Sequence, residues 1–245
     1  IQLPSSVKKI GNRAFSGCVA LEKAEYNASG IKEAGVSIFE NCKNLKSIVV
    51  PSVVSEVTSK DFAGCDALEE VTFLDGVTKI GNDAFNGKPI WRIVLPQTLQ
   101  SIGDRAFKGN KLSGLIAFPE SLTSIGNEAF SGHGFAGIGL PWTLTSIGQN
   151  AFACGEKANL KYLFVPFAGK TKNSGNLIDV FSEKGLSNLE QLYINGGTIN
   201  GASLKGLGNV ELFASGEVKI ESGSLDETQW YKSQRDGIVY IGEIL

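Results

Sequence analysis

A nine-residue motif returns along this chain at nearly constant intervals, and this periodicity constrains the fold more than any other feature. The motif reads LTSIGNEAF at 122–130, LTSIGQNAF at 144–152 and LQSIGDRAF at 99–107. Its final aromatic residue recurs every 22 to 24 residues, at Phe15, Phe39, Phe62, Phe85, Phe107, Phe130 and Phe152. A fixed period of this length is typical of a solenoid, in which each coil buries its apolar side only by stacking on its neighbours. The Phe rings should therefore form one continuous ladder.

Residues suited to tight turns occupy fixed places in each motif. An inward-pointing Ile precedes a Gly that suits a corner needing positive φ or close backbone approach, at Gly11, Gly81, Gly103, Gly126 and Gly148. The next residues have side chains that commonly cap a helix start, at Asn12, Asn82, Asp104 and Asn127. A Gly or Asn two positions after the Phe suits the left-handed end of a helical turn. The sequence therefore predicts one short helical segment in each coil.

The other side of each coil carries the pattern of a β-strand. Apolar residues stand at positions one, four and six, as in Leu45, Ile48 and Val50. A spacing of two is strand periodicity, and the Pro that often follows, such as Pro51, ends a strand because it has no N–H to donate. Stacked coils should therefore form a parallel sheet with strands about 4.8 Å apart.

The repeat becomes less regular in the last third of the chain. The next aromatic match, Phe181, follows Phe152 by 29 residues, across a polar segment at 168–176 that we interpret as an exposed inserted loop. Leu204 and Leu225 are candidates to replace Phe in two further coils. We therefore divide the chain into regular repeats at 1–166 and degenerate repeats at 167–245, both parts of one continuous solenoid. The Asp236-Gly237 turn signal predicts a hairpin near the end.

The combined pattern L-P-x-x-L-x-S-I-G-x-x-A-F-x-G-C-x-x-L-x-x-I-x-L resembles the BspA-like leucine-rich repeats of bacterial surface proteins. The match is strong from Leu3 to about Val165 and weak beyond, although the closing WYKSQRDGIVYIGEIL is similar to a segment that interrupts repeats in that family. The chain departs from the pattern at Thr58, Asp61, Lys88, Asn110 and His133. The departures affect single coils and leave the solenoid prediction intact.

This resemblance implies a leucine-rich-repeat solenoid of the α/β class, a right-handed coil with strands on one face and short helical turns on the other. We expect about ten coils of roughly 23 residues. The proteins that it resembles are mostly secreted or anchored to the cell surface, and some are adhesins. The resemblance implies neither catalysis nor a cofactor, and it supplies no fixed set of binding residues.

Composition narrows the classes of partner. The formal net charge is -2 and acids and bases are interspersed, so no basic stripe is present to attract nucleic acid or an anionic membrane surface. No run approaches the roughly 20 apolar residues needed to cross a bilayer. The chain has no Met and begins inside a motif, so we expect it to be a mature fragment of a longer protein.

Three of the four cysteines and the single histidine occupy one slot of the repeat, whereas Cys154 comes one position earlier and lies too far from Cys65 to bridge. Cys18, Cys42 and Cys65 each lie three residues after a repeat Phe, which is also the place of His133. Buried reduced thiols are the favoured interpretation, with one disulfide between neighbouring coils as the alternative. The spacing of 23 to 24 residues does not resemble a zinc site, and we expect no metal. A formal glycosylation sequon begins at Asn27.

The outward-facing strand residues are distributed unevenly. The first coils carry charges, whereas the middle two are almost bare, with a predicted floor of Gly114, Ala117, Ala136, Gly137 and Gly139. Large side chains stand on both sides of this floor, so we expect a shallow trough. Its candidate ligand-binding residues are Trp91, Arg92, Leu115, Tyr162, Phe164 and Tyr193.

These features support three hypotheses about function. We favour a noncatalytic binding scaffold, secreted or on the cell surface, that recognises a host or neighbouring-cell protein or glycan on the strand face. The alternative is a structural spacer that projects another domain. The third is a glycan hydrolase, which would require two carboxylates about 5–10 Å apart in a cleft. The exposed aromatics have a further interpretation, because the inserted loop or the C-terminal coils could cover them.

Overall fold

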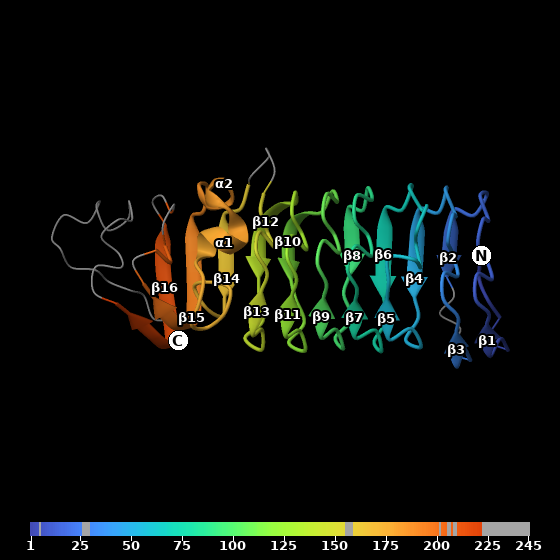
Figure 1. Cartoon of the computed structure of the whole chain (residues 1–245), viewed down its shortest axis with the longest axis horizontal. Helices are drawn as coiled ribbons and strands as arrows, with labels where there is room; N and C mark the ends of the chain where they lie inside the picture. Colours follow the sequence, from blue (N-terminus) through green and yellow to red (C-terminus); the bar gives the residue numbers. More distant parts are fainter. Residues whose placement is uncertain are drawn as a thin grey trace.

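The computed structural model describes residues 1–4, 6–25, 30–154, 159–200, 202–204, 207 and 210–221. The chain is an elongated stack of coils that runs steadily from the N-terminus to β16 (Figure 1). The described residues form about nine coils, compared with the ten expected. Leu225, the sequon at Asn27 and the predicted hairpin at Asp236-Gly237 lie outside the described residues. The solenoid prediction is confirmed.

The strand side of the stack consists of two parallel sheets end to end. The first contains β2 (Lys23–Glu25), β4 (Ser47–Val50), β6 (Glu70–Phe73) and β8 (Arg92–Val94). The second contains β10 (Ser113–Ala117), β12 (Gly134–Gly139), β14 (Tyr162–Val165), β15 (Gln191–Ile199) and β16 (Glu211–Ile220). Gly114, at φ +80°, lies at an irregularity in the pairing of β10 with β12. These strands lie where the apolar pattern of the coils predicted them.

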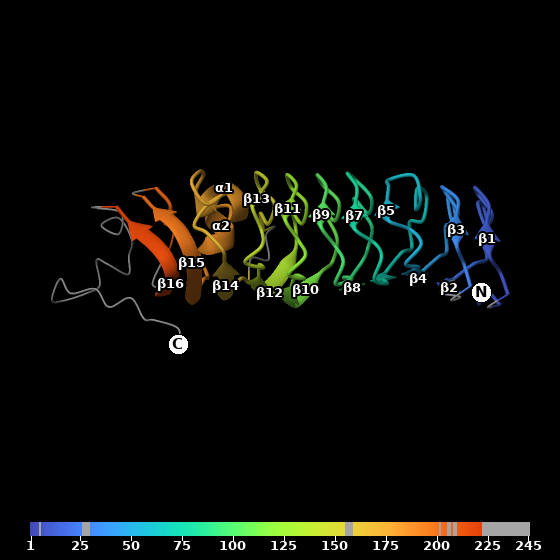
Figure 2. The ribbon, with the colours of Figure 1, turned by 90° about the horizontal axis from the view of Figure 1, so that it is seen from below.

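A third parallel sheet follows a different side of the stack (Figure 2). Its two-residue strands are β5 (Glu56–Val57), β7 (Lys79–Ile80), β9 (Ser101–Ile102), β11 (Ser124–Ile125) and β13 (Ser146–Ile147). At the N-terminal end, β1 (Lys9–Ile10) pairs with β3 (Glu33–Ala34) in the same parallel sense. A strand of two residues is too short to show periodicity, so the sequence did not predict this sheet.

The predicted helical segment in each coil is wrong for the regular repeats, where turns follow the corner Gly. The second residue after that Gly is left-handed, with φ between 53° and 56° at Arg13, Asp83, Arg105, Glu128 and Asn150. A left-handed residue prevents the run of right-handed residues that a helix needs. Within the described residues, the helices are α1 (Leu177–Phe181) and α2 (Glu183–Leu186).

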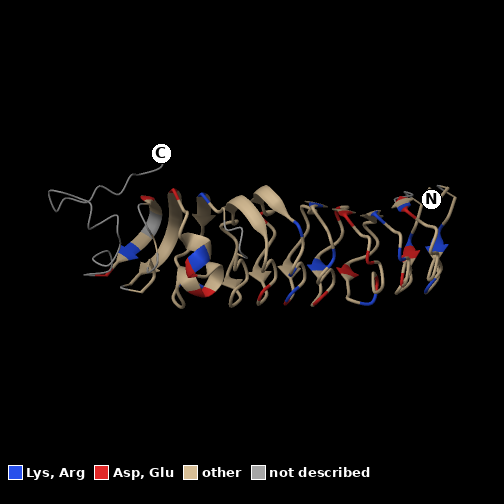
Figure 3. Ribbon diagram, turned by 90° about the horizontal axis from the view of Figure 1, so that it is seen from above, with Lys and Arg blue, Asp and Glu red and all other residues tan. Residues whose placement is uncertain are grey.

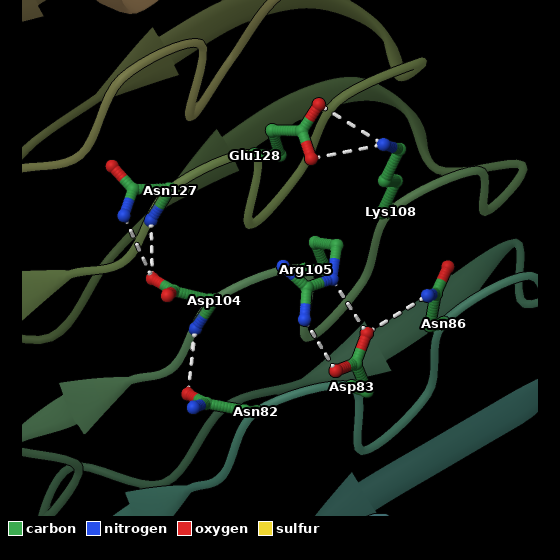
Figure 4. A network of polar contacts seen from close by, with 8 residues as sticks. All are labelled: Asn82, Asp83, Asn86, Asp104, Arg105, Lys108, Asn127 and Glu128. Atoms are coloured by element: carbon green, nitrogen blue, oxygen red, sulfur yellow. Dashed lines mark hydrogen bonds and ion pairs between the residues drawn. The ribbon is translucent and has the colours of Figure 1, made fainter.

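The Asn and Asp side chains after the corner Gly connect neighbouring coils rather than capping helices (Figure 4). Asn82 Oδ1 accepts a hydrogen bond from the backbone N–H of Asp104 at 2.9 Å. Asp104 Oδ1 in turn accepts from the N–H of Asn127 at 2.7 Å. Each side chain therefore satisfies the equivalent N–H group one coil further along, which fixes the register of the stack.

The corner residues must be Gly because the backbone of the preceding coil approaches them closely. This is the second of the two reasons that the sequence suggested, the first being positive φ. A Cβ atom on Gly103 would lie 2.4 Å from Asn82 Oδ1, and one on Gly148 would lie 2.3 Å from the backbone nitrogen of Asn127. Gly11 stands in the first coil and would meet nothing within 4 Å. The constraint therefore comes from the preceding coil and not from the turn itself.

The Phe ladder is confirmed. Successive rings from Phe15 to Phe152 are stacked with centroids 5.2 to 6.3 Å apart, and Phe181 at the end of α1 continues the stack at 5.4 Å from Phe152. The left-handed position two residues after the Phe is also confirmed, at Gly17, Asn41, Gly64, Gly87, Gly109 and Gly132. The aromatic ladder forms the centre of the hydrophobic core.

The slot three residues after the Phe holds a hydrogen-bond donor. The thiol of Cys65 donates to the carbonyl oxygen of Phe39 at 3.0 Å, and Asn110 Nδ2 donates to that of Phe85 at 2.9 Å. Both acceptors lie in the preceding coil, which explains why Cys and Asn are interchangeable here. All four cysteines are free; Cys18 is exposed, against the expectation of burial, because it stands in the first coil.

The inserted loop is hydrogen-bonded to β13, the last strand of the third sheet. Ile147 N donates to Lys170 O at 2.7 Å, and Thr171 forms an antiparallel bridge with Ser174. The chain then enters α1, where Asn176 and Asp179 form a capping box. Of the segment 168–176 predicted to be exposed, residues 172–174 at the tip are exposed, whereas Ala168 and Gly169 at its start are buried.

Candidate binding face

The structure places the six predicted binding residues on the outward side of the strand sheets. Trp91 immediately precedes β8, and Arg92 begins it. Leu115 lies on β10 and is the most exposed large apolar residue of the described chain at 77%. Tyr162 and Phe164 of β14 are 38% and 39% exposed, and Tyr193 of β15 is half-buried. The alternative in which other parts of the chain cover these aromatics is therefore not favoured for Tyr162 and Phe164.

The aromatics of the last three strands form a second ladder on this face. The rings of Phe164 and Tyr193 stack with centroids 4.2 Å apart and planes within 5°. Tyr193 stacks in the same way on Phe213 of β16, at 4.5 Å and 8°. We call these three residues the outer ladder. Phe213 was not predicted from the sequence because its coil has no recognisable motif, although the buried Leu212 beside it marks Phe213 as outward-facing.

The outer ladder stops at β12, where Gly139 is the partner of Phe164 in the strand register. A Cβ on Gly139 would meet nothing closer than Ile116 O at 3.8 Å and Ala117 Cβ at 3.9 Å. The space above Gly139 and Ala117, beside the ring of Phe164, is therefore free of larger side chains from β10 and β12. We call this space the open rung.

The neighbouring row of the face is filled. A Cβ on Gly137 would lie 2.7 Å from Leu115 Cδ2 and 3.5 Å from Tyr162 Cβ. Leu115 therefore lies over Gly137, next to Tyr162, and covers part of the floor that the sequence predicted to be bare. The structure thus brings Leu115, Tyr162 and Phe164 together around the open rung.

Trp91 and Arg92 are not part of this group. They stand three strands from β14, which corresponds to roughly 14 Å at about 4.8 Å per strand. A break also separates them, because β8 and β10 are edge strands of different sheets. Arg92 Nη1 lies 3.6 Å from Glu70 Oε2, so its charge is directed toward β6. The predicted trough therefore has one aromatic wall, Tyr162 and Phe164, next to its floor. The other predicted wall, Trp91 and Arg92, is separated from the floor by this break.

Charges surround the centre of the face without entering it (Figure 3). The strands β10 and β12 contain no Lys, Arg, Asp or Glu. Ion pairs flank them, such as Lys23 with Glu25 toward the N-terminus and Lys161 with Glu190 toward the C-terminus, both at 2.7 Å. An apolar patch bordered by polar groups is a common form of interaction surface.

The described residues contain no cluster of three His, Cys, Asp or Glu side chains that could hold a metal ion. His133 and Cys154 are close enough to suggest a catalytic pair. Burial, however, lowers the pKa of His133 to about 4 and raises the pKa of Cys154 to about 11. Both groups are therefore neutral near pH 7, and the thiol is not activated as a nucleophile.

Neither helix in the described part of the chain could span a lipid bilayer, since α1 has five residues and α2 has four.

Comparison with known families gives one match. A model described as BspA type leucine rich repeat region, in six copies, matches residues 1–91 and 78–170. No curated protein matches the chain significantly.

Three solved structures illustrate what the chain is similar to. A leucine rich repeat protein of T. pallidum is 32% identical over 62% of this chain and 73% of that chain, with a TM-score of 0.47. A leucine rich cell surface protein of Faecalibacterium prausnitzii is 17% identical over 93% and 90%, with a TM-score of 0.39. A leucine-rich repeat protein of Bacteroides ovatus is 21% identical over 91% and 69%, with a TM-score of 0.40.

Proposed function

Because the chain belongs to the BspA-type leucine-rich repeat family, we propose that it is a noncatalytic binding scaffold, secreted or held at the cell surface. Its partner is a protein or glycan of a host or neighbouring cell, bound on the strand face. The secreted or surface location is proposed from the family, whose members mostly have it.

The open rung beside Phe164 is the observation that carries this proposal. A flat apolar group placed above Gly139 would lie about 4.8 Å from the ring of Phe164 and would extend the outer ladder by one member. Leu115 and Tyr162 would contact the same group from the neighbouring row. Aromatic side chains of a protein and the apolar face of a sugar ring both have the required shape.

Burial of the exposed apolar side chains would drive this binding. Leu115, Tyr162 and Phe164 expose much of their surface to water, and covering apolar area contributes about 25 cal/mol per Å². Aromatic residues at the centre of an interface often account for most of its energy. A ligand that covers the open rung would desolvate these three residues together.

The proposal is tested with an array of glycans and matrix proteins. Tyr162→Ala and Phe164→Ala should each weaken binding of any positive ligand at least tenfold, which corresponds to about 1.4 kcal/mol. Val36→Ala is the control, because Val36 is 62% exposed but lies off the strand face. Trp91→Ala, alone and combined with Tyr162→Ala, shows whether the ligand crosses the break between β8 and β10. Undiminished binding by the Tyr162 and Phe164 variants would refute the strand-face site and favour a structural spacer.

A further inference from the structure

A tryptophan breaks the repeat pattern at the end of β12. The residue after the strand-ending Pro is polar at Ser52, Gln97 and Glu120, whereas Pro166 is followed by Phe167, which is buried in the core. In the coil of β12 this position holds Trp142, whose side chain is 50% exposed. At this corner the other side chains are either polar or, in Phe167, buried, so the half-exposed indole of Trp142 needs a separate explanation.

A pocket of about 360 Å³ adjoins Trp142. Its other walls come from Thr143, Leu144 and Thr145 in the same coil, and from the end of β14, the inserted loop and the middle of β15, at Pro166, Phe167, Lys172, Asn195 and Gly196. The volume lies within the range of small-molecule sites, about 300–1,000 Å³. None of the six residues predicted for the strand face lines it, so this pocket is a distinct site.

The loop wall of the pocket is held in place by close contacts. A Cβ on Gly197, which has φ +83°, would lie 2.7 Å from Lys172 O, so the loop backbone packs directly on β15. Within the loop, the hydroxyl oxygens of Thr171 and Ser174 lie 2.7 Å apart in a hydrogen bond. The pocket is therefore largely formed before any ligand binds, which lowers the entropic cost of binding.

The polar groups around the pocket form a complementary set. Ser215 Oγ donates to Asn195 Oδ1 at 2.8 Å, which orients the amide and leaves Nδ2 as a donor. The hydroxyls of Thr143 and Thr145 donate to backbone carbonyls of the preceding coil, so their oxygens remain acceptors. Lys172 is the one charged residue in the lining given above, and no Asp or Glu stands in it.

We propose that this pocket binds a pyranose ring that carries a carboxylate, the chemistry of hexuronic and sialic acids. The apolar face of the ring packs on the indole of Trp142. Its hydroxyl groups exchange hydrogen bonds with Asn195, Thr143 and Thr145, and its carboxylate pairs with Lys172. The positive charge favours an acidic sugar over a neutral one, because Lys172 has no carboxylate partner in the lining. The site does not depend on the strand-face proposal.

The test follows the indole N–H signals of the ¹⁵N-labelled chain, which contains three tryptophans. The signal that disappears in Trp142→Phe identifies Trp142. Oligogalacturonate and N-acetylneuraminic acid are titrated separately, and at least one should shift this signal while leaving that of Trp91 in place; the two titrations distinguish the two sources of the carboxylate. Methyl-esterified oligogalacturonate, which keeps the ring and loses the charge, should bind roughly fivefold more weakly than the free acid if the uronate is the ligand.

Matched variants make the result decisive. Trp142→Ala should abolish binding, and Lys172→Gln should reduce acid binding roughly fivefold, whereas Lys111→Gln, a change at an exposed site outside the pocket, should leave it unchanged. Thermal unfolding checks that each variant folds. A Trp142 signal that neither acid moves would overturn the proposal. Binding that survives Trp142→Ala would also overturn the proposal. So would a result in which N-acetylneuraminic acid does not bind and methyl-esterified oligogalacturonate binds as tightly as the free acid.

Discussion

The Nε2 atom of His133 lies 3.6 Å from the Sγ atom of Cys154, inside the core of the solenoid. The backbone N–H of Phe135 donates to His133 Nδ1 at 2.9 Å, so the ring proton is on Nε2, which lies 3.0 Å from Phe152 O. The pair therefore resembles a Cys-His dyad in position but holds a neutral ring and a neutral thiol. Its role is to satisfy buried carbonyl and amide groups between coils.

His133 should make stability depend on pH in a defined window. Its pKa falls from 6.5 to about 4 because burial disfavours the charged ring. Between pH 6.5 and 4 the imidazole binds a proton in the unfolded chain but not in the folded chain. The contribution of His133 to stability is therefore fully present above pH 6.5 and decreases as the pH falls toward 4. The expected loss is about 3 kcal/mol at 1.36 kcal/mol per pKa unit.

His133→Asn is the matched variant, because Asn110 occupies the same slot one coil earlier. The chain has a single histidine, so no other imidazole contributes. Urea unfolding at pH 7, 6, 5 and 4 should show a steep decline for the parent chain and a shallower one for the variant. Parallel profiles would contradict the assignment.

A methyl group on Gly126 should destabilise the stack through the preceding coil. Its Cβ would lie 2.5 Å from the backbone nitrogen of Asp104, which is too close for real atoms. We expect Gly126→Ala to cost about 1–3 kcal/mol of unfolding free energy, the usual cost of overpacking. Gly11→Ala should change stability by less than about 0.5 kcal/mol, since nothing lies within 4 Å there. Equal losses in denaturant titrations would show that turn geometry, and not stacking, sets the requirement.

Truncation in the middle of the Phe ladder should divide the solenoid. Phe107 is 1% exposed and stacks on Phe85 and Phe130 with centroids 5.3 and 5.2 Å away. We expect Phe107→Ala to cost about 3–5 kcal/mol. Because each coil contacts only its neighbours, unfolding should separate into two transitions, visible by hydrogen exchange. Phe15→Ala, in a half-buried terminal coil, should cost less and leave a single transition.

The ion pair of Asp83 and Arg105 should contribute modestly to the same stacking (Figure 4). Arg105 Nε and Nη2 donate to the two carboxylate oxygens at 2.9 and 2.8 Å, and this hydrogen bonding lowers the pKa of Asp83. The side chains are 34% and 42% exposed, so solvent screening keeps the coupling small.

A double-mutant cycle with Asp83→Asn and Arg105→Gln measures this coupling. Because the carboxyl pKa is lowered, the contribution should be present above pH 3.8 and disappear as the carboxylate is protonated below it. It should also shrink in 1 M salt. A coupling energy that salt leaves unchanged would argue against an electrostatic origin.

The sequence predicted the features that repeat and missed those that depend on contacts between coils. Phe spacing alone gave the ladder, and the outward strand positions located Phe164 and Leu115. The sequence could not reveal that Asn82 bonds to the next coil, because an Asn before a turn has the same signature as a helix cap. It also could not show that Leu115 covers Gly137, since Gly114 interrupts the strand register only in three dimensions. Trp142 was not singled out from the sequence, and its pocket depends on a loop whose position no local pattern encodes.

Filling the open rung should separate binding from folding on the strand face. A side chain at Gly139 would meet nothing closer than 3.8 Å, so Gly139→Tyr should fold normally and extend the outer ladder from Phe164. Cross-strand aromatic pairs contribute roughly 0.2–1 kcal/mol, and we expect the variant to be as stable as the parent chain or slightly more so. The new ring would occupy the place proposed for the ligand, so binding should fall at least tenfold. Thr72→Tyr is the control, because Thr72 belongs to the same row but lies on β6, beyond the break between β8 and β10. A Gly139→Tyr chain that folds and binds its ligand unchanged would show that the open rung is not where the partner sits.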